Sequence, residues 1–373
     1  MEHGFTPIIQ KILAKHFSST SRQVFEKSPL LQYINLKTVS AMRGSKARAS
    51  FANLYAIYVL VEDYIQHSFH KKGNYSEYEG ARFGQLFARQ RQLPFGAKLQ
   101  NHGLNDRLNG EFRKFFPQEQ IQPILRVVET KRYWINQKLL RIPIGKKKYD
   151  LAEAILEIID AYAKEKQASF NHFITMCEQL QTFSKKNHKE AETFIYDLIA
   201  PNVDARIFEI VSYAILKHYY HNQIVYFGFQ MDAIEKYPLK LYKTGRTNAN
   251  DGGIDFVMTP LGRFFQVTET LDIRKYFLDI DKIERYPITF VIKSEEPETV
   301  LRQKLKKGAE TQYAIKSIIE KYMQCIEEII NLPKLRDCFQ SIIFTGLLHE
   351  VLGEIIHQSK VEFNYDDSFS LTT

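Results

Sequence analysis

Two polar side chains interrupt otherwise apolar segments in the second half of the sequence. Asp255 lies in IDFVM and Gln266, eleven residues later, lies in RFFQVTE. Burying a charge or an amide without a partner costs free energy, so both residues need an explanation. Side chains alternate across a strand, which places Gln266 and Thr268 on one face and Val267 and Glu269 on the other. A two-stranded hairpin would then bring Asp255 beside Gln266 and Thr268.

These residue types are oxygen ligands of the kind that Mg²⁺ binds. One or two carboxylates, a neutral oxygen and several waters complete its octahedral coordination. Such a metal polarises a phosphodiester oxygen and lowers the pKa of a bound water that attacks phosphorus. A further carboxylate, Glu209, interrupts the apolar helical pattern RIFEIVSYAILKHYY. The expected metal ligands are therefore Asp255, Gln266 and Glu209.

Each residue also has an ordinary structural interpretation. Asp255 follows two glycines and could cap a turn, a frequent role of Asp. Gln266 and Thr268 could lie on the solvent-facing side of an antiparallel sheet. Glu209 could be a solvated residue on a helix surface. The three structural interpretations are less probable in combination than any one of them is alone.

The elements that must position these residues form a helix and a small sheet. The sequence predicts a helix over residues 206–220 and β-type runs over residues 254–258, 263–270 and 286–293. Residues 298–330 again have helical spacing. The second half of the chain is thus expected to be a small mixed sheet flanked by helices.

The first half has mostly helical patterns. The first forty residues are amphipathic, and the apolar run over residues 51–64 is long enough for a buried helix. Residues 80–117 are broken by Gly and Pro and predict loops and short helices, whereas residues 149–198 predict a helical layer. The expected fold class is α/β (α+β), with a mainly helical region over residues 1–200 and a second region over residues 201–373.

Composition limits the class of protein. Of the 373 residues, 44% are hydrophobic and 25% are charged, which is typical of a globular chain rather than a disordered one. The sequence lacks an 18-residue apolar run, so no membrane association is expected and the predicted location is cytoplasmic. Three widely spaced cysteines predict neither a disulfide framework nor a zinc site. The net charge of +8 favours a polyanionic partner.

The residues that could read DNA lie mainly in the first half. Arg and Lys pair with guanine and Asn and Gln with adenine, while other basic residues contact phosphates. Any single member could be an ordinary surface residue, but the density of the cluster favours DNA contact. The expected base-reading residues are Arg82, Gln85, Arg89, Arg91, Gln92, Lys98, Gln100, Asn101, His102, Asn105 and Arg107. The expected phosphate contacts are Arg43, Lys46 and Arg48, with Arg246 and Asn248 gripping the phosphate to be cut.

A helical Glu, then GG-x-D in a strand, then an apolar strand carrying Gln-x-Thr resembles the PD-(D/E)XK nuclease superfamily. The resemblance covers about residues 206–293. It matches Glu209 to the helical acid, Asp255 to the metal-binding Asp, and Gln266 to the Glu/Gln of the second half-motif. Thr268 stands where the family usually has its catalytic Lys. Glu269 is a second-rank candidate for the site, and Arg274 and Lys275 are cationic substitutes for that Lys.

The resemblance, together with the Arg- and Gln-rich first half, implies a type II restriction endonuclease. It implies Mg²⁺-dependent cleavage of double-stranded DNA at a specific site, with residues 201–373 as the nuclease core. A cognate DNA methyltransferase would be encoded nearby, and a homodimer is expected because a palindromic site requires two-fold symmetry. Two other classes stay open: a nuclease of DNA repair or RNA processing, and a non-catalytic nucleic-acid-binding protein.

Overall fold

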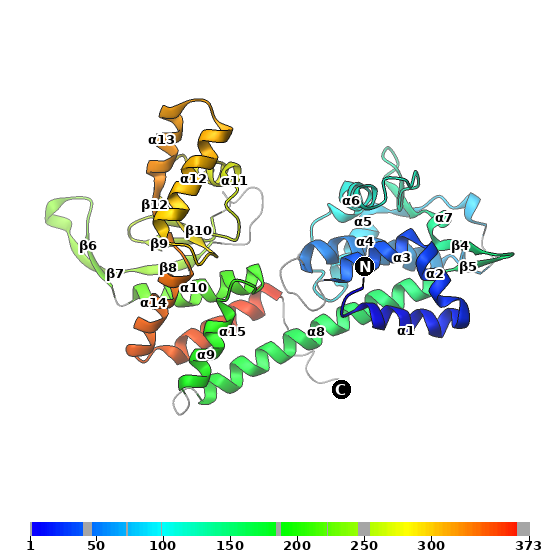
Figure 1. Cartoon of the computed structure of the whole chain (residues 1–373), viewed down its shortest axis with the longest axis horizontal. Coiled ribbons are helices and arrows are strands. Elements are labelled where there is room, and N and C mark those ends of the chain that lie inside the picture. The colour runs from blue at the N-terminus through cyan, green and yellow to red at the C-terminus, as the bar shows by residue number, and fades with distance from the viewer. Residues whose placement is uncertain are drawn as a thin grey trace. The chain divides into compact units, whose positions relative to one another are not determined.

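The protein has a mixed α+β fold, seen here in a computed structural model. The structure describes residues 2–39, 47–71, 74–97, 99–183, 188–221, 223–244 and 254–363. The chain divides into two compact units, Met1–Phe173 and Ile174–Thr373, which are treated one at a time below (Figure 1).

The first unit is mostly helical. Its helices are α1 (Thr6–Phe17), α2 (Ser21–Lys27), α3 (Pro29–Thr38), α4 (Ala47–Gln66), α5 (Phe83–Gln92), α6 (Leu108–Phe115), α7 (Gln137–Leu140) and the first part of α8 (Ala152–Phe183). Its strands are β1 (Ala81–Arg82), β2 (Ile124–Val127), β3 (Arg132–Ile135), β4 (Arg141–Ile144) and β5 (Lys147–Asp150). They form a three-stranded sheet in the order β1-β3-β2 and a β4-β5 hairpin.

Helix α4 is the centre of this unit. Its side chains from Leu54 to Val61 are all buried, so the helix is covered on every side, as expected for an apolar helix without a polar face. The ring of Phe51 packs on Phe95 and on Tyr162 of α8, and Tyr162 also packs on Phe5 beside α1. Helices α1, α4 and α8 thus share one core.

The second unit is built around a five-stranded sheet. Its helices are the remainder of α8, α9 (His188–Leu198), α10 (Ala205–His221), α11 (Ile273–Lys282), α12 (Glu298–Gln312), α13 (Lys316–Cys325), α14 (Leu332–Phe344) and α15 (Leu348–Phe363). Its strands are β6 (Ile224–Phe227), β7 (Glu235–Pro238), β8 (Lys240–Lys243), β9 (Phe256–Thr259), β10 (Arg263–Thr268), β11 (Ile288–Ile292) and β12 (Ile326–Ile330).

The sheet is mixed, in the order β12-β11-β10-β9-β8. Strands β8, β9 and β10 pair antiparallel, whereas β10, β11 and β12 pair parallel. On the face that we call the α10 face, Phe256 and Phe265 pack against Tyr213 and Tyr220 of α10. On the opposite face, called the α11 face, Phe290 packs against Tyr276 of α11 with ring centroids 4.3 Å apart. The sheet is therefore covered by helices on both faces.

Strands β6 and β7 form a separate two-stranded ribbon. In the sequence the ribbon follows α10 and precedes β8. Figure 1 shows it extending away from the five-stranded sheet. The ribbon carries large apolar side chains in water: Tyr226 is 74% exposed, Phe229 96% and Met231 88%. A backbone hydrogen bond from Leu239 N to Gln223 O, 2.9 Å long, closes its base.

Most of the expected elements are confirmed. The helix predicted over residues 206–220 is α10, the buried helix is part of α4, and the three expected strands are β9, β10 and β11. The expectation that residues 298–330 are entirely helical is wrong, because Ile326–Ile330 is strand β12 and pairs parallel with β11. Its sequence, IEEII, is rich in β-branched residues, which favour strands.

The two units divide after Phe173, within the continuous helix α8, whereas the sequence placed its boundary after residue 200. The change of composition at Pro201 marks where the sheet-bearing sequence begins, while α9 already packs on α10 and α15 of the second unit. In the described part of the chain, no helix combines the length and apolarity required to span a membrane.

Candidate functional site

Asp255 lies where strands β9 and β10 separate. The last paired residues are Phe256 and Phe265, and Asp255 N still donates to Phe265 O at 3.0 Å. One residue further, Val267 N donates to the Asp255 carboxylate at 2.7 Å. Because β9 no longer pairs with β10 at this point, the Asp255 side chain accepts the hydrogen bond from Val267 N that a paired strand would otherwise accept. The predicted hairpin forms and its register places Asp255 next to Gln266 along the strands, but the carboxylate accepts from Val267 N and Thr268 lies beyond the residues of β10 that pair with β9.

The environment of Asp255 opposes its ionisation. The residue is 7% exposed, and burial raises the pKa of its carboxyl group to about 8, helped by the neighbouring Glu209 carboxylate. The hydrogen bond from Val267 and the positive charges of Lys243 and Lys275 lower the pKa of Asp255 but do not offset the burial. A buried acid beside a second acid is a common arrangement at functional sites, where a bound cation would favour the charged form.

The raised pKa of Asp255 predicts a pH dependence of stability. Without a cation, the folded protein retains a proton on Asp255 up to a pKa of about 8, whereas the unfolded chain loses it near 3.8, the ordinary pKa of an Asp side chain. The unfolded state thus binds fewer protons in this range, so the free energy of unfolding falls as the pH rises to about 8. The Asn side chain of Asp255→Asn does not titrate, so the free energy of unfolding no longer falls with pH for this reason. The variant keeps an acceptor for Val267 N. Thermal melts in EDTA should show the variant increasingly more stable than wild type from pH 5 to pH 9; a constant difference would contradict the prediction.

Glu209 is held beside Asp255 by Lys243. Glu209 lies on α10, its side chain is 26% exposed, and one of its oxygens is 2.8 Å from Lys243 Nζ. Lys243 ends β8 opposite Phe256, the residue after Asp255. The alternative of a freely solvated Glu209 is therefore wrong. The sequence analysis missed Lys243, although it is a charged residue directly before the Gly-rich loop that leads to Asp255.

Gln266 and Thr268 lie on the α11 face. They pair with Phe290 and Ile292 of β11 and are 5% and 4% exposed, so the alternative of a solvent-facing position is wrong. Gln266 Oε1 is buried without a hydrogen-bond partner, while its Nε2 donates to Val267 O at 3.4 Å. Thr268 Oγ1 donates to Thr270 O at 3.2 Å. A long charged side chain at position 268 would lie beneath α11, out of reach of water.

Glu269 lies on the other side of β10 from Thr268, as alternation requires. Its carboxylate is 2.5 Å from Lys293 Nζ, and that ammonium group also contacts Val203 O and lies over the Phe208 ring. Of the two cationic substitutes named from the sequence, Arg274 donates to Gln312 on α12. Only Lys275 is close enough to Asp255 to act on its pKa.

The chemistry of the donors fits Mg²⁺. The Asp255 and Glu209 carboxylates are hard oxygen ligands. The orphaned Gln266 Oε1 is also an acceptor that a cation would satisfy, but Gln266 lies on the α11 face whereas Glu209 reaches the sheet from α10. Within the described ranges, the structure has no cluster of three or more His, Cys, Asp or Glu side chains arranged for a metal ion. A magnesium ion here would therefore depend on Asp255, Glu209 and water, and the predicted ligand Gln266 would have to reach it from the α11 face.

Some of the predicted DNA-reading residues form internal contacts and others are exposed. Arg89 forms a double hydrogen bond with Glu62, Arg107 pairs with Glu111, and Asn105 accepts from Tyr133. The remaining described members are exposed: Arg82, Gln85, Arg91, Gln92, Gln100, Asn101 and His102. The predicted contacts Arg43, Lys46, Lys98, Arg246 and Asn248 and the side chain of Arg48 lie outside the described residues.

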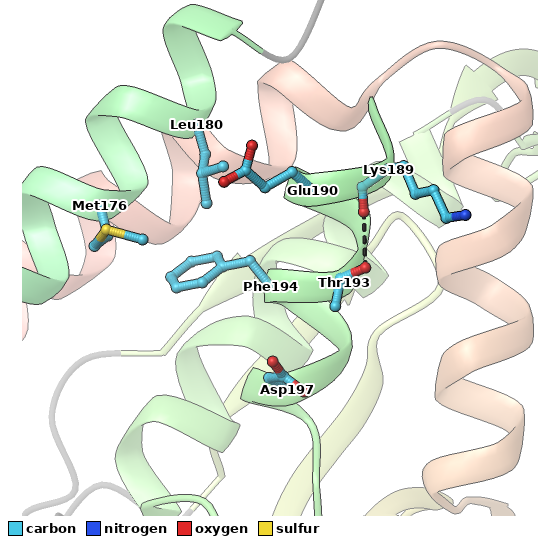
Figure 2. A pocket seen from close by; sticks show the side chains of 7 residues that line it. All are labelled: Met176, Leu180, Lys189, Glu190, Thr193, Phe194 and Asp197. Carbon is cyan, nitrogen blue, oxygen red and sulfur yellow. Dashed lines mark hydrogen bonds between the residues drawn. The ribbon is translucent and has the colours of Figure 1, made fainter. Parts of the chain in front are cut away.

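The second unit has an open groove of its own. Figure 2 shows it between helices α8 and α9, with Met176 and Leu180 on one side and Phe194 on the other. The dashed line marks the hydrogen bond from Thr193 Oγ1 to Lys189 O, 2.8 Å long, along α9. None of the predicted site residues lines this groove.

No family model matches the chain, and no curated protein or solved structure matches it either. The function must therefore be argued from the residues of the candidate site.

Proposed function

We propose that the protein is a Mg²⁺-dependent endonuclease that cuts double-stranded DNA, of the type II restriction class. The observation that carries the proposal is Asp255, a buried acid where strands β9 and β10 separate, with Glu209 close enough to raise its pKa. Burial of an acid beside another acid is costly, and a divalent cation offsets that cost.

The arrangement of elements supports the same proposal. The PD-(D/E)XK resemblance requires an acid on a helix, an Asp at the start of a strand and a Glu or Gln on the next strand, within a mixed sheet flanked by helices. Here Glu209 is on α10, Asp255 directly precedes β9 and Gln266 is on β10. Glu209 and Gln266 thus lie on elements of the kind that the resemblance requires, and Asp255 directly precedes one.

The proposed mechanism assigns roles to the chain's own groups. A bound Mg²⁺ would supply Lewis-acid polarisation of the phosphodiester and a water of lowered pKa. Asp255 and Glu209 would provide the negative charge to hold it, and Gln266 would add a neutral oxygen only if its side chain reached the ion from the α11 face. The hydrogen bond from Val267 N fixes the Asp255 carboxylate at the strand edge. Thr268 contributes no charge, so the cation that stabilises the phosphorane must come from another residue.

DNA reading is proposed for the exposed polar surface of the first unit, at α5 and the segment before α6. Arg82, Arg91 and Asn101 on this surface have the donor types that read base edges or bind phosphates. A palindromic site would be cut by a homodimer, with a methyltransferase protecting the host DNA in the cytoplasm. These partners follow from the proposed restriction role.

Arg82 provides a test of the DNA-binding surface. We expect Arg82→Gln to weaken DNA binding and to reduce the slope of log K against log salt by about 1 if Arg82 contacts a phosphate. Fluorescence anisotropy at several salt concentrations, with Ca²⁺ in place of Mg²⁺, measures both quantities. Lys27→Gln removes the same charge from an exposed position at the end of helix α2 and is the matched control. Equal effects of the two variants would argue against a specific surface.

The decisive experiment for the function is digestion of unmethylated phage DNA with the purified full chain and Mg²⁺, followed by sequencing of the ends. Discrete fragments with a shared end sequence support the restriction class. A smear, or cutting of structured RNA, would favour the nuclease of repair or RNA processing. Binding of DNA without Mg²⁺-dependent turnover would favour the non-catalytic alternative and overturn the proposal.

A further inference from the structure

Position 268 cannot carry the positive charge that a phosphodiester-cleaving site of this kind needs. Thr268 is 4% exposed, faces α11 and uses its hydroxyl in a local hydrogen bond to Thr270 O. The negative charge that develops on phosphorus is stabilised by groups that are already in place before the reaction. A lysine on a neighbouring element must therefore take this role.

Lys243 lies next to both carboxylates of the candidate site. It ends β8 opposite Phe256, and the following residue continues the contact, since Thr244 N donates to Asp255 O at 3.0 Å. Lys243 Nζ lies 2.8 Å from Glu209 Oε1 on the α10 face, and its side chain is 19% exposed. The charge of Lys243 also lowers the pKa of Asp255.

Two other lysines are less suitable. The side chain of Lys293 is 4% exposed, and its ammonium group is already bound to Glu269 and Val203 O. Lys275 lies on the exposed side of the first turn of α11 and has a weaker effect on Asp255 than Lys243 has. Of these three lysines, only Lys243 has both an ion pair with a proposed metal ligand and a side chain that water can reach.

We propose that Lys243 supplies, from strand β8, the positive charge that the PD-(D/E)XK pattern places at position 268. This inference rests on the proposed nuclease function. Without a divalent cation, Lys243 neutralises Glu209. A cation that binds Glu209 competes with the Lys243 ammonium group, which is then free to contact the phosphate oxygens of DNA. Lys243 is thus both a competitor for the metal ligand and a partner of the reacting phosphate.

This dual role makes a prediction that a purely structural role does not make. Lys243→Gln removes the competitor, so Mn²⁺ should bind the variant about threefold or more tightly than wild type in titrations followed by electron paramagnetic resonance. The same variant should cleave DNA about 100-fold or more slowly at saturating Mg²⁺, the loss typical of one transition-state contact. Tighter binding with slower cleavage is the expected combination.

The controls separate the possible outcomes. Lys240→Gln, at the exposed other end of β8, removes the same charge and should stay within about twofold of wild type in both measurements. Lys243→Arg keeps the charge, so it should bind Mn²⁺ like wild type yet cleave more slowly; it also tests the role if Lys243→Gln does not fold by circular dichroism. Wild-type cleavage in both Lys243 variants, or weaker Mn²⁺ binding in Lys243→Gln, overturns the inference. Absence of cleavage by wild type overturns the nuclease function instead, while the Mn²⁺ comparison still tests the competition for Glu209.

Discussion

Asp255→Ala is expected to reduce Mg²⁺-dependent cleavage more than about 100-fold, because losing a metal ligand should exceed the 10- to 100-fold loss typical of its hydrogen-bonding partners. The variant loses the buried carboxylate and the acceptor for Val267 N. Since Asp255 destabilises the folded state when it ionises, its removal should leave the protein folded. Single-turnover cleavage measures the rate, and anisotropy in Ca²⁺ measures DNA binding, which should change little.

Two further variants make this test specific. Asp255→Asn retains the hydrogen bond from Val267 and removes only the charge, so it should lose activity to a similar extent. Asp272→Asn changes an exposed acid that caps α11 of the same unit and keeps a capping side chain, so it should cleave like wild type. Full activity in both Asp255 variants would show that the candidate site is misassigned.

Phe290→Ala is expected to destabilise the second unit by about 3–5 kcal/mol, the usual cost of truncating a buried Phe. Phe290 is fully buried on the interior strand β11, between β12 and β10, and packs on Tyr276. Far-UV circular dichroism during urea unfolding reports on both units. Tryptophan fluorescence reports on the first unit only, because the single tryptophan is Trp134. The variant should shift a circular dichroism transition to lower urea and leave the fluorescence transition in place.

Phe344→Ala is the matched control for this measurement. Phe344 ends α14 and is 94% exposed, so its truncation should change the free energy of unfolding by less than about 0.5 kcal/mol. A small effect of Phe290→Ala, or equal shifts in both signals, would mean that the β11 packing does not stabilise the second unit independently.

Sequence periodicity predicted the elements that hold the candidate site. The apolar runs around Asp255 and Gln266 gave β9 and β10 in the correct register, because alternation and a short turn leave little freedom in a hairpin. The helix carrying Glu209 was also predicted. Strand β12 was missed because IEEII follows a helix without a break, and only pairing with β11 makes it a strand.

The partners of the site residues could not be predicted from spacing. Lys243 pairs with Glu209 across 34 positions of sequence, and this contact depends on how α10 packs against β8. The burial of Thr268 likewise depends on α11, which follows it in sequence and folds back over that face. Local alternation shows which side chains share a face, whereas the identity of the covering helix is a tertiary property.

The closed base of the β6-β7 ribbon makes its tip a permissive insertion point. Chain entry and exit are joined at Gln223 and Leu239, so extra residues at the tip would lengthen the ribbon without separating Glu209 from Lys243. A fluorophore or affinity tag inserted near Met231 should therefore leave the pairing of β8 with β9 intact.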